Sequence, residues 1–278
     1  MLPKDLVVFL EEEKGRESRL AFSATLAGLW QAHLIATFVV PRLELNRHAS
    51  FAVGHGVAQM LHNHWDHVER AIAETKGLHD TLMERHGVTG EWRVSENECS
   101  EELMLHARHA SLTIIAPSPT EDRAITMLGL SERVIVGSGR PTILLPTEWP
   151  ADRIARRIVV GWNAGREATR AIADAMPFLV NAEKVQLVVV PEAKAQSLYG
   201  LEPGADMARH LARHGVAVDL DQHSGTDAGT VLLDQCSAID ADMLVIGAVG
   251  RSRISEFIFG GATRTILENA DLPVLLSR

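Results

Sequence analysis

The sequence predicts an α/β protein built from two tandem, open, five-stranded parallel α/β sandwiches. Three observations support this fold class. Short, continuously apolar runs alternate with amphipathic helical segments, the pattern of the first half returns in the second, and a glycine-rich loop follows a late apolar run. Continuous apolar runs are typical of parallel strands that are buried on both faces, whereas half-exposed strands alternate apolar and polar residues.

The first three elements of each half correspond closely. Each half opens with an apolar run, continues with a helical segment and returns to an apolar run; these elements are 5–10, 17–30 and 33–40 in the first half and 157–161, 165–176 and 185–190 in the second. The tripeptide Gly15-Arg16-Glu17 recurs 150 positions later as Gly165-Arg166-Glu167. An internal repeat of this length indicates two copies of one folding unit.

The later elements also correspond, at a different spacing. The segment 84–88 matches 212–216, and in both a glycine follows the end of a predicted helix. The first half therefore has about 22 additional residues before its third strand. Residues 111–116 match 242–247, and 141–146 match 273–277. We predict domains at 1–148 and 154–278, with the two final strands, one from each half, pairing within the chain as a pseudo-dimer.

Composition excludes several kinds of partner. The net charge of −9 disfavours nucleic acid and anionic lipid, and no apolar run is long enough for a membrane span. The N-terminus has no signal-peptide pattern, and Cys99 and Cys236 lack metal-type spacing. We expect a cytoplasmic protein with reduced thiols and with no nucleic-acid or membrane partner.

The glycine-rich loop has the chemistry of a phosphate site. It follows the run 243–246, and its glycines are Gly247, Gly250, Gly260 and Gly261. Glycine lets the backbone approach a ligand, and the N–H groups of a following helix attract anions. Thr263 could supply a hydroxyl, and Arg251, Arg253 and Arg264 could supply positive charge. A purely structural role for the glycines is the alternative.

Other phosphate motifs are missing from the sequence. It has no G-x4-G-K-[ST] pattern, which disfavours a P-loop NTPase, and no G-x-G-x-x-G follows either first strand. No Ser/His/Asp, Cys/His or paired-carboxylate arrangement is evident, so we do not expect an enzyme. His62, His64 and His67 cluster in the additional segment, where we expect a solvated helix rather than a metal site.

Three segments resemble the universal stress protein family. They are 158–163 (IVVGWN), the G-x2-G-x9-G loop and 267–276 (LENADLPVLL), and the two halves together resemble the family's tandem form over nearly the whole chain. The resemblance implies a Rossmann-like fold of the adenine nucleotide alpha hydrolase type, with ATP, with or without Mg²⁺, as the ligand.

The resemblance also implies positions for the ligand. Gly247, Gly250 and Gly260 match the family loop, and a residue near Val190 would meet the base. Asn163 stands where the family usually has aspartate, and Gly261 stands where it has Ser or Thr. The corresponding first-half loop, 116–122, contains two prolines and two acidic residues, so we predict no similar nucleotide site there.

Two main functions follow from these observations. The first is a stress-response sensor or regulator that binds ATP or a related adenine nucleotide in its second half, without rapid turnover. The second is a scaffold of the same fold that acts through an unknown protein partner. An ATP-dependent enzyme is a third class, and it would need a second polar cluster facing the loop. The sequence leaves open whether two chains associate as a homodimer.

Overall fold

The computed structural model describes residues 2–40, 55–95, 101–118, 129–191, 202–225, 227–248 and 259–278. Strands and helices alternate along each half, as the apolar runs predict. The first half contains β1 (Asp5–Leu10), α1 (Arg16–Trp30), β2 (His33–Val39), α2 (His55–His86), β3 (Gly90–Ser95), α3 (Glu101–His109), β4 (Leu112–Ile115), α4 (Leu130–Gly137) and β5 (Thr142–Leu144).

The second half repeats this order of elements. It contains β6 (Arg157–Trp162), α5 (Arg166–Leu179), β7 (Lys184–Val189), α6 (Ala205–Arg213), β8 (Val218–Gln222), α7 (Ala228–Ala238), β9 (Met243–Gly247), α8 (Gly261–Asn269) and β10 (Val274–Ser277). The described residues of each half thus contain five strands, and the predicted α/β fold class with two repeated units is confirmed. No helix in the described part of the chain is both long and apolar enough to cross a bilayer.

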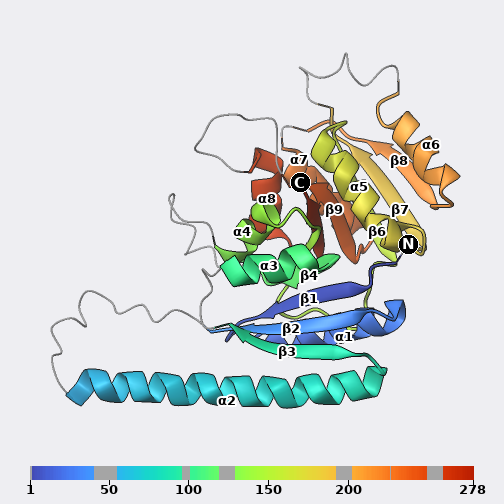
Figure 1. Cartoon of the computed structure of the whole chain (residues 1–278). Helices are drawn as coiled ribbons and strands as arrows, with labels where there is room; N and C mark the ends of the chain where they lie inside the picture. The colour runs from blue at the N-terminus through green and yellow to red at the C-terminus, as the bar shows by residue number, and fades with distance from the viewer. Residues whose placement is uncertain are drawn as a thin grey trace.

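All ten strands form one sheet in the order β3-β2-β1-β4-β5-β10-β9-β6-β7-β8. Pairing is parallel within each half, and β5 and β10 pair antiparallel at the centre, with Ile143 opposite Leu275. The predicted pairing of the two final strands within one chain is therefore confirmed (Figure 1). The antiparallel joint arises because a pseudo-twofold relation turns the second half over relative to the first.

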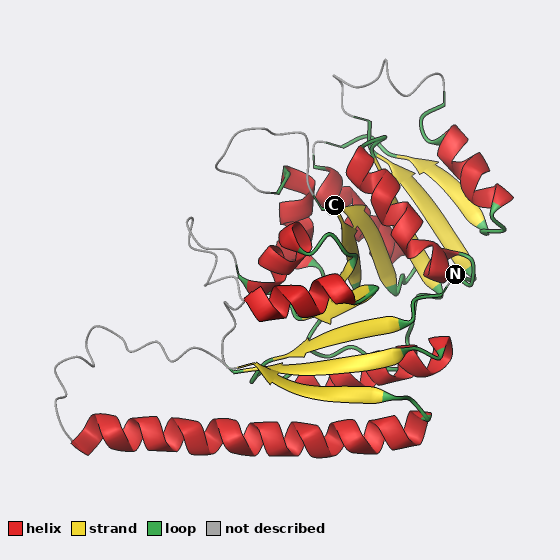
Figure 2. Cartoon of the chain, in the orientation of Figure 1, coloured by secondary structure: helices red, strands yellow, loops and turns green. Residues whose placement is uncertain are grey.

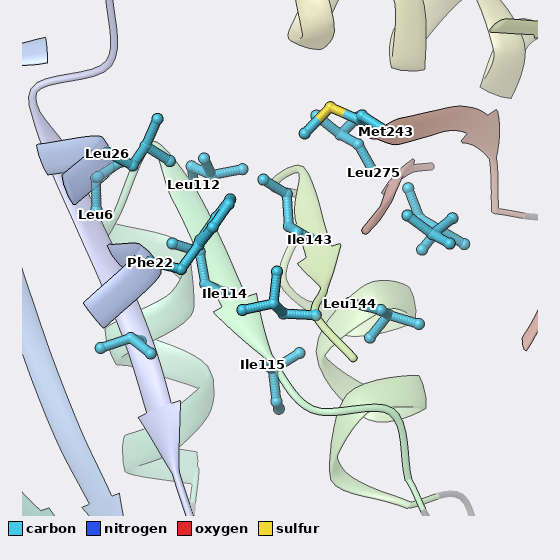
Figure 3. Close-up of a cluster of buried hydrophobic side chains, with 14 of the residues drawn as sticks. Leu6, Phe22, Leu26, Leu112, Ile114, Ile115, Ile143, Leu144, Met243 and Leu275 are labelled. Atoms are coloured by element: carbon cyan, nitrogen blue, oxygen red, sulfur yellow. The ribbon is translucent and has the colours of Figure 1, made fainter. Parts of the chain in front are cut away.

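The two halves share a single hydrophobic core. Figure 3 shows buried side chains from both halves around the central joint, including Ile143 and Leu144 of β5, Met243 of β9 and Leu275 of β10. Figure 2 shows helices packed against the strands of this continuous sheet. A helix of each half also contributes to the contact between them, because the ring centroid of Trp30 at the end of α1 lies 4.7 Å from that of Phe178 in α5. The halves are therefore joined by a shared core and by strand pairing as well as by the linker.

The additional residues of the first half form most of α2, a 32-residue helix, whereas its counterpart α6 has nine residues. In Figure 1, α2 runs beside the outer strand β3, and its first turns extend past it. As predicted, a glycine follows each helix: Gly87 has φ +61° and Gly215 has φ +82°, a left-handed conformation that favours glycine.

A histidine is buried between α3 and β2. His106 is 8% exposed, and its Nδ1 lies 3.4 Å from the hydroxyl oxygen of Thr37. Burial lowers the pKa of His106, and the nearby positive charge of Arg93 lowers it further. The unfolded chain therefore takes up this proton more readily than the folded protein does, and protonation favours unfolding.

We expect this histidine to make stability depend on pH. Its contribution is fully present above the ordinary histidine pKa of about 6.5 and is lost as the pH falls through the lower pKa of the folded state. Urea unfolding of the wild type and His106→Gln at pH 7.5 and pH 5.5 measures this contribution. The variant should lose less stability on acidification than the wild type. Equal losses of stability in the two proteins would show that the pKa of His106 does not differ between the folded and unfolded states.

Candidate functional site

The candidate site lies at the carboxyl ends of β6, β7 and β9, where ligands bind in open parallel sheets. Strand β9 ends at Gly247, and α8 begins at Gly261 with Gly260 as its N-cap, so the predicted strand, loop and helix are all present. Residues 249–258 of the intervening loop, including Gly250, Arg251 and Arg253, lie outside the described residues. The site is therefore built here from its two described ends.

The first turn of α8 is open. Gly260 provides no side chain to cap the helix, and a Cβ placed on the exposed Gly261 would meet no described atom within 4 Å. The N–H groups at the start of a helix need partners, and together with the helix dipole they favour an anion. A phosphate group therefore fits the chemistry of this helix end.

Thr263 and Arg264, by contrast, are engaged within the fold. Thr263 is buried, and its hydroxyl lies 3.5 Å from the carbonyl oxygen of Gly247, to which it donates. This contact ties the first turn of α8 to the end of β9. Arg264 pairs with Glu268 one turn further along the helix, at 2.8 Å. In the structure both side chains therefore make contacts within the fold, and their predicted roles toward a ligand stay predictions.

Gly247 has a packing reason to be glycine. A Cβ at this position would lie 2.6 Å from the backbone nitrogen of Ala168 and 2.6 Å from the carbonyl carbon of Glu167, in the first turn of α5. Backbone atoms of a helix cannot move aside cheaply, so Gly247 permits close contact between β9 and α5. A ligand that approaches the backbone here, as we propose, would be a second reason for the lack of a side chain at Gly247.

Substitution Gly247→Ala should therefore destabilise the protein, by about 1–3 kcal/mol, the usual cost of overpacking. Chemical denaturation measures this loss, and Gly261→Ala is the matched control because its Cβ enters open space. The control should be at least as stable as the wild type, since alanine is the better helix former. Equal stability of Gly247→Ala and the wild type would contradict the packing explanation.

Asn163 and Val190 follow the ends of β6 and β7. The exposed Asn163 accepts a hydrogen bond at its Oδ1 from the backbone N–H of Gly165, at 2.9 Å, which shapes the turn into α5. Val190 directly follows β7, is partly buried and packs against the core. The structure thus brings both predicted residues to the same sheet edge, on adjacent strands.

The first half fills the equivalent helix end with its own side chains. The hydroxyl oxygen of Ser118, just after β4, accepts from the backbone N–H of Ser131 in the first turn of α4 at 3.3 Å. The two serine hydroxyl oxygens lie 2.7 Å apart, and the Ser131 hydroxyl donates to Glu132 at 3.2 Å. Glu132 is only 4% exposed. A hydroxyl and a carboxylate therefore occupy the place where a phosphate would bind.

The sequence predicts the lack of a site in this half from the prolines and acidic residues of 116–122, and the contacts of Ser118, Ser131 and Glu132 are an additional reason that the structure reveals. Pro117 and Ser118 are described, and residues 119–128 lie outside the described part. A serine at the second position of a helix and a glutamate at the third are visible in the sequence. Their contact with Ser118, thirteen positions earlier, depends on the fold.

Two of the clustered histidines of α2 contact different acidic residues. His62 pairs with Asp66 at 3.4 Å, whereas His67 pairs with Glu12 in the loop after β1. Among the residues that the structure describes, no three His, Cys, Asp or Glu side chains are arranged to hold a metal ion. Burial raises the pKa of the Cys236 thiol to about 12, which keeps it in the unreactive protonated form. Cys99 lies outside the described residues.

A pocket of about 250 Å³ lies at the opposite, amino end of the second half, where the linker enters β6. It is lined by Asp152, Arg153, Arg156, Arg157, Glu183 and Asp242. Its arginines already have partners: Arg153 and Arg157 pair with Asp240, and Arg156 pairs with Glu183. The hydrogen bond from Arg153 holds the pKa of Asp240 below its usual range. These contacts clamp the linker to the sheet.

Comparison with known proteins agrees with this architecture. Residues 155–278 match the model of the universal stress protein family. A universal stress protein from Archaeoglobus fulgidus has a similar structure, with a TM-score of 0.72 and 14% identity, covering 98% of this chain and 96% of the other. A putative universal stress protein from Pseudomonas aeruginosa UCBPP-PA14 has a TM-score of 0.63 and 15% identity, covering 99% and 93%.

A further similar structure, a functionally unknown protein from Pseudomonas aeruginosa PAO1, has a TM-score of 0.62 and 14% identity, covering 99% of this chain and 92% of that one. No curated protein sequence matches the chain. At these identities the solved structures establish the fold over the full length, whereas the family match is confined to the second half. Residues 155–278 therefore belong to the universal stress protein family, and the preceding half repeats the fold of that domain in tandem.

Proposed function

We propose that the second half binds ATP or a related adenine nucleotide and that the protein acts as a stress-response sensor or regulator. The observation that supports this most strongly is the difference between two equivalent helix ends. Both helices have a glycine N-cap, but the first turn of α4 contacts Ser118 and contains the buried Glu132, whereas no side chain of the described residues caps the start of α8 at Gly260 and Gly261. Only an open helix end can accept a phosphate from outside the chain.

The remaining parts of the proposed site lie around this helix end. Gly247 and Gly260 bracket the loop, and Asn163 and Val190 line the neighbouring strand ends. We propose that Gly250 and Arg251 complete the phosphate contacts and that Mg²⁺ accompanies the phosphates when ATP is bound. Binding would alter a conformation or a partner surface in the cytoplasm, without rapid hydrolysis. Release of inorganic phosphate over hours tests that last expectation.

Calorimetric titration of the purified protein with ATP tests the proposal. We expect about one equivalent of nucleotide per chain, because the first half is closed by its own side chains. Gly261→Ser restores the hydroxyl that the family usually has, and the open space at this position accommodates it. The variant should bind at least as tightly as the wild type. No binding by either protein would contradict the proposal.

The alternative function, a scaffold that acts through a protein partner, is favoured by one specific contact. Asn163 brings no charge, and its Oδ1 already accepts from Gly165. The exposed first turns of α2 offer a surface on which a partner could bind, with Trp65 49% and Met60 44% exposed. On this alternative, ATP would not bind, and the glycine loop would be only a connection between β9 and α8.

A further inference from the structure

Three neighbouring strands of the second half end in register. Trp162 of β6 pairs with Val189 of β7, which in turn pairs with Gln222 of β8. The next residue on each strand is therefore in the same row at the carboxyl edge of the sheet: Asn163, Val190 and His223. The backbone N–H of His223 donates to the carbonyl oxygen of Val189 at 2.9 Å, so the pairing between the strands continues to this row.

Side-chain direction separates this row from the preceding one. Successive residues of a strand point to opposite faces of a sheet. The preceding row packs beside the turn at Gly204, because a Cβ there would lie 2.7 Å from a methyl group of Val189 and 3.8 Å from Trp162. Gln222 donates from its side chain to Pro203 in the same turn, at 3.1 Å. Residues of the next row are thus expected to face away from this turn.

His223 has an unused polar atom. Its Nε2 is shielded from solvent and has no hydrogen-bond partner among the described residues, although the residue as a whole is only partly buried. Most buried polar atoms in folded proteins have a hydrogen-bond partner, and leaving a buried ring nitrogen without one costs free energy. A ligand that displaces the atoms covering Nε2 and brings a hydrogen-bonding group to this edge would supply the missing partner.

We propose that His223 recognises the base of the bound nucleotide through Nε2. This inference rests on the proposed nucleotide site and extends it to a residue that neither the sequence patterns nor the family match identifies. The phosphates would lie at Gly247 and the start of α8, and the base would lie over the row of Asn163, Val190 and His223. Adenine offers both an amino donor and ring-nitrogen acceptors, so it can pair with Nε2 as an acceptor or as a donor.

The test compares ATP and GTP binding to the wild type and to His223→Leu by calorimetry. We expect ATP binding to weaken about tenfold in the variant, and the preference for ATP over GTP to fall by a similar factor. His223→Gln, which keeps a polar side chain, should recover part of both. His210→Leu, at an exposed position of α6, is the matched control and should change neither. Melting temperatures establish that each variant is folded.

The outcomes distinguish this inference from the proposal on which it rests. If the wild type binds ATP and His223→Leu binds it equally well, His223 is not a base contact and the nucleotide site stands. If the variant loses ATP and GTP affinity equally, His223 only supports the end of β8, which also overturns the inference. If the wild type binds neither nucleotide, the proposed function fails and this inference fails with it.

Discussion

Gly261→Glu should weaken ATP binding strongly while leaving the fold intact. The new carboxylate would stand in the first turn of α8, where we place the phosphates, and a Cβ at this position meets no described atom within 4 Å. Two like charges about 4 Å apart near a protein surface repel by up to about 4 kcal/mol before screening by salt. We therefore expect ATP affinity to fall by about a hundredfold, measured by calorimetry at moderate ionic strength.

The same substitution should not destabilise the protein. A carboxylate near the N-terminus of a helix stabilises it by about 0.3–1 kcal/mol, and replacing glycine within a helix adds to this. Gly261→Gln is the matched control, because it has the same size without the charge, and it should keep most of the affinity. The first half already contains such an arrangement, with Glu132 in the first turn of α4. Equal ATP binding by Gly261→Glu and Gly261→Gln would contradict the proposed phosphate position.

Arg19→Leu should cause the largest loss of stability. Arg19 lies in α1 with no exposed surface, its Nη1 donates to the carbonyl oxygen of Phe9 at 3.2 Å, and it pairs with Glu13. Breaking a buried ion pair by removing one partner typically costs about 3–5 kcal/mol. Because the Glu13 side chain is 29% exposed, water can compensate part of its charge, and we expect a loss of about 3 kcal/mol.

Urea denaturation measures this loss, and two further variants interpret it. Arg170→Leu removes an exposed arginine of α5 that pairs with Asp174 one turn away, and it should change stability by less than about 1 kcal/mol. Adding Glu13→Gln to Arg19→Leu should recover part of the loss, because it removes the unpaired carboxylate. A variant Arg19→Leu as stable as the wild type would refute a structural role for the buried pair.

The sequence was sufficient to predict the strands, their repeat and the central pairing, because these depend on local apolar runs and on matching order. The matches 111–116 to 242–247 and 141–146 to 273–277 fall on β4, β9, β5 and β10, which occupy equivalent places in the sheet. The position of the glycine loop between β9 and α8 could also be predicted from the sequence, because the strand, the loop and the helix follow one another along the chain.

Contacts between distant segments could not be predicted in this way. Arg19 looks like an ordinary surface residue of an amphipathic helix, but the fold buries it completely beside Phe9 and Glu13. Ser118 meets Ser131 only because the end of β4 and the start of α4 share one sheet edge. The loop pattern predicts a ligand role for Gly247, and the fold adds a second reason for glycine, because the first turn of α5 leaves no space for a Cβ there.

The central claim is that one of the two sheet halves binds a nucleotide and that the other is closed by its own side chains. A crystal structure of the full chain grown with ATP and Mg²⁺ tests it most directly. We predict one nucleotide per chain, with its phosphates at the start of α8 beside Gly247 and Gly261, and Ser118 still in contact with Ser131 at α4. An empty edge at α8 in crystals saturated with ATP, or a nucleotide at α4, would contradict the account.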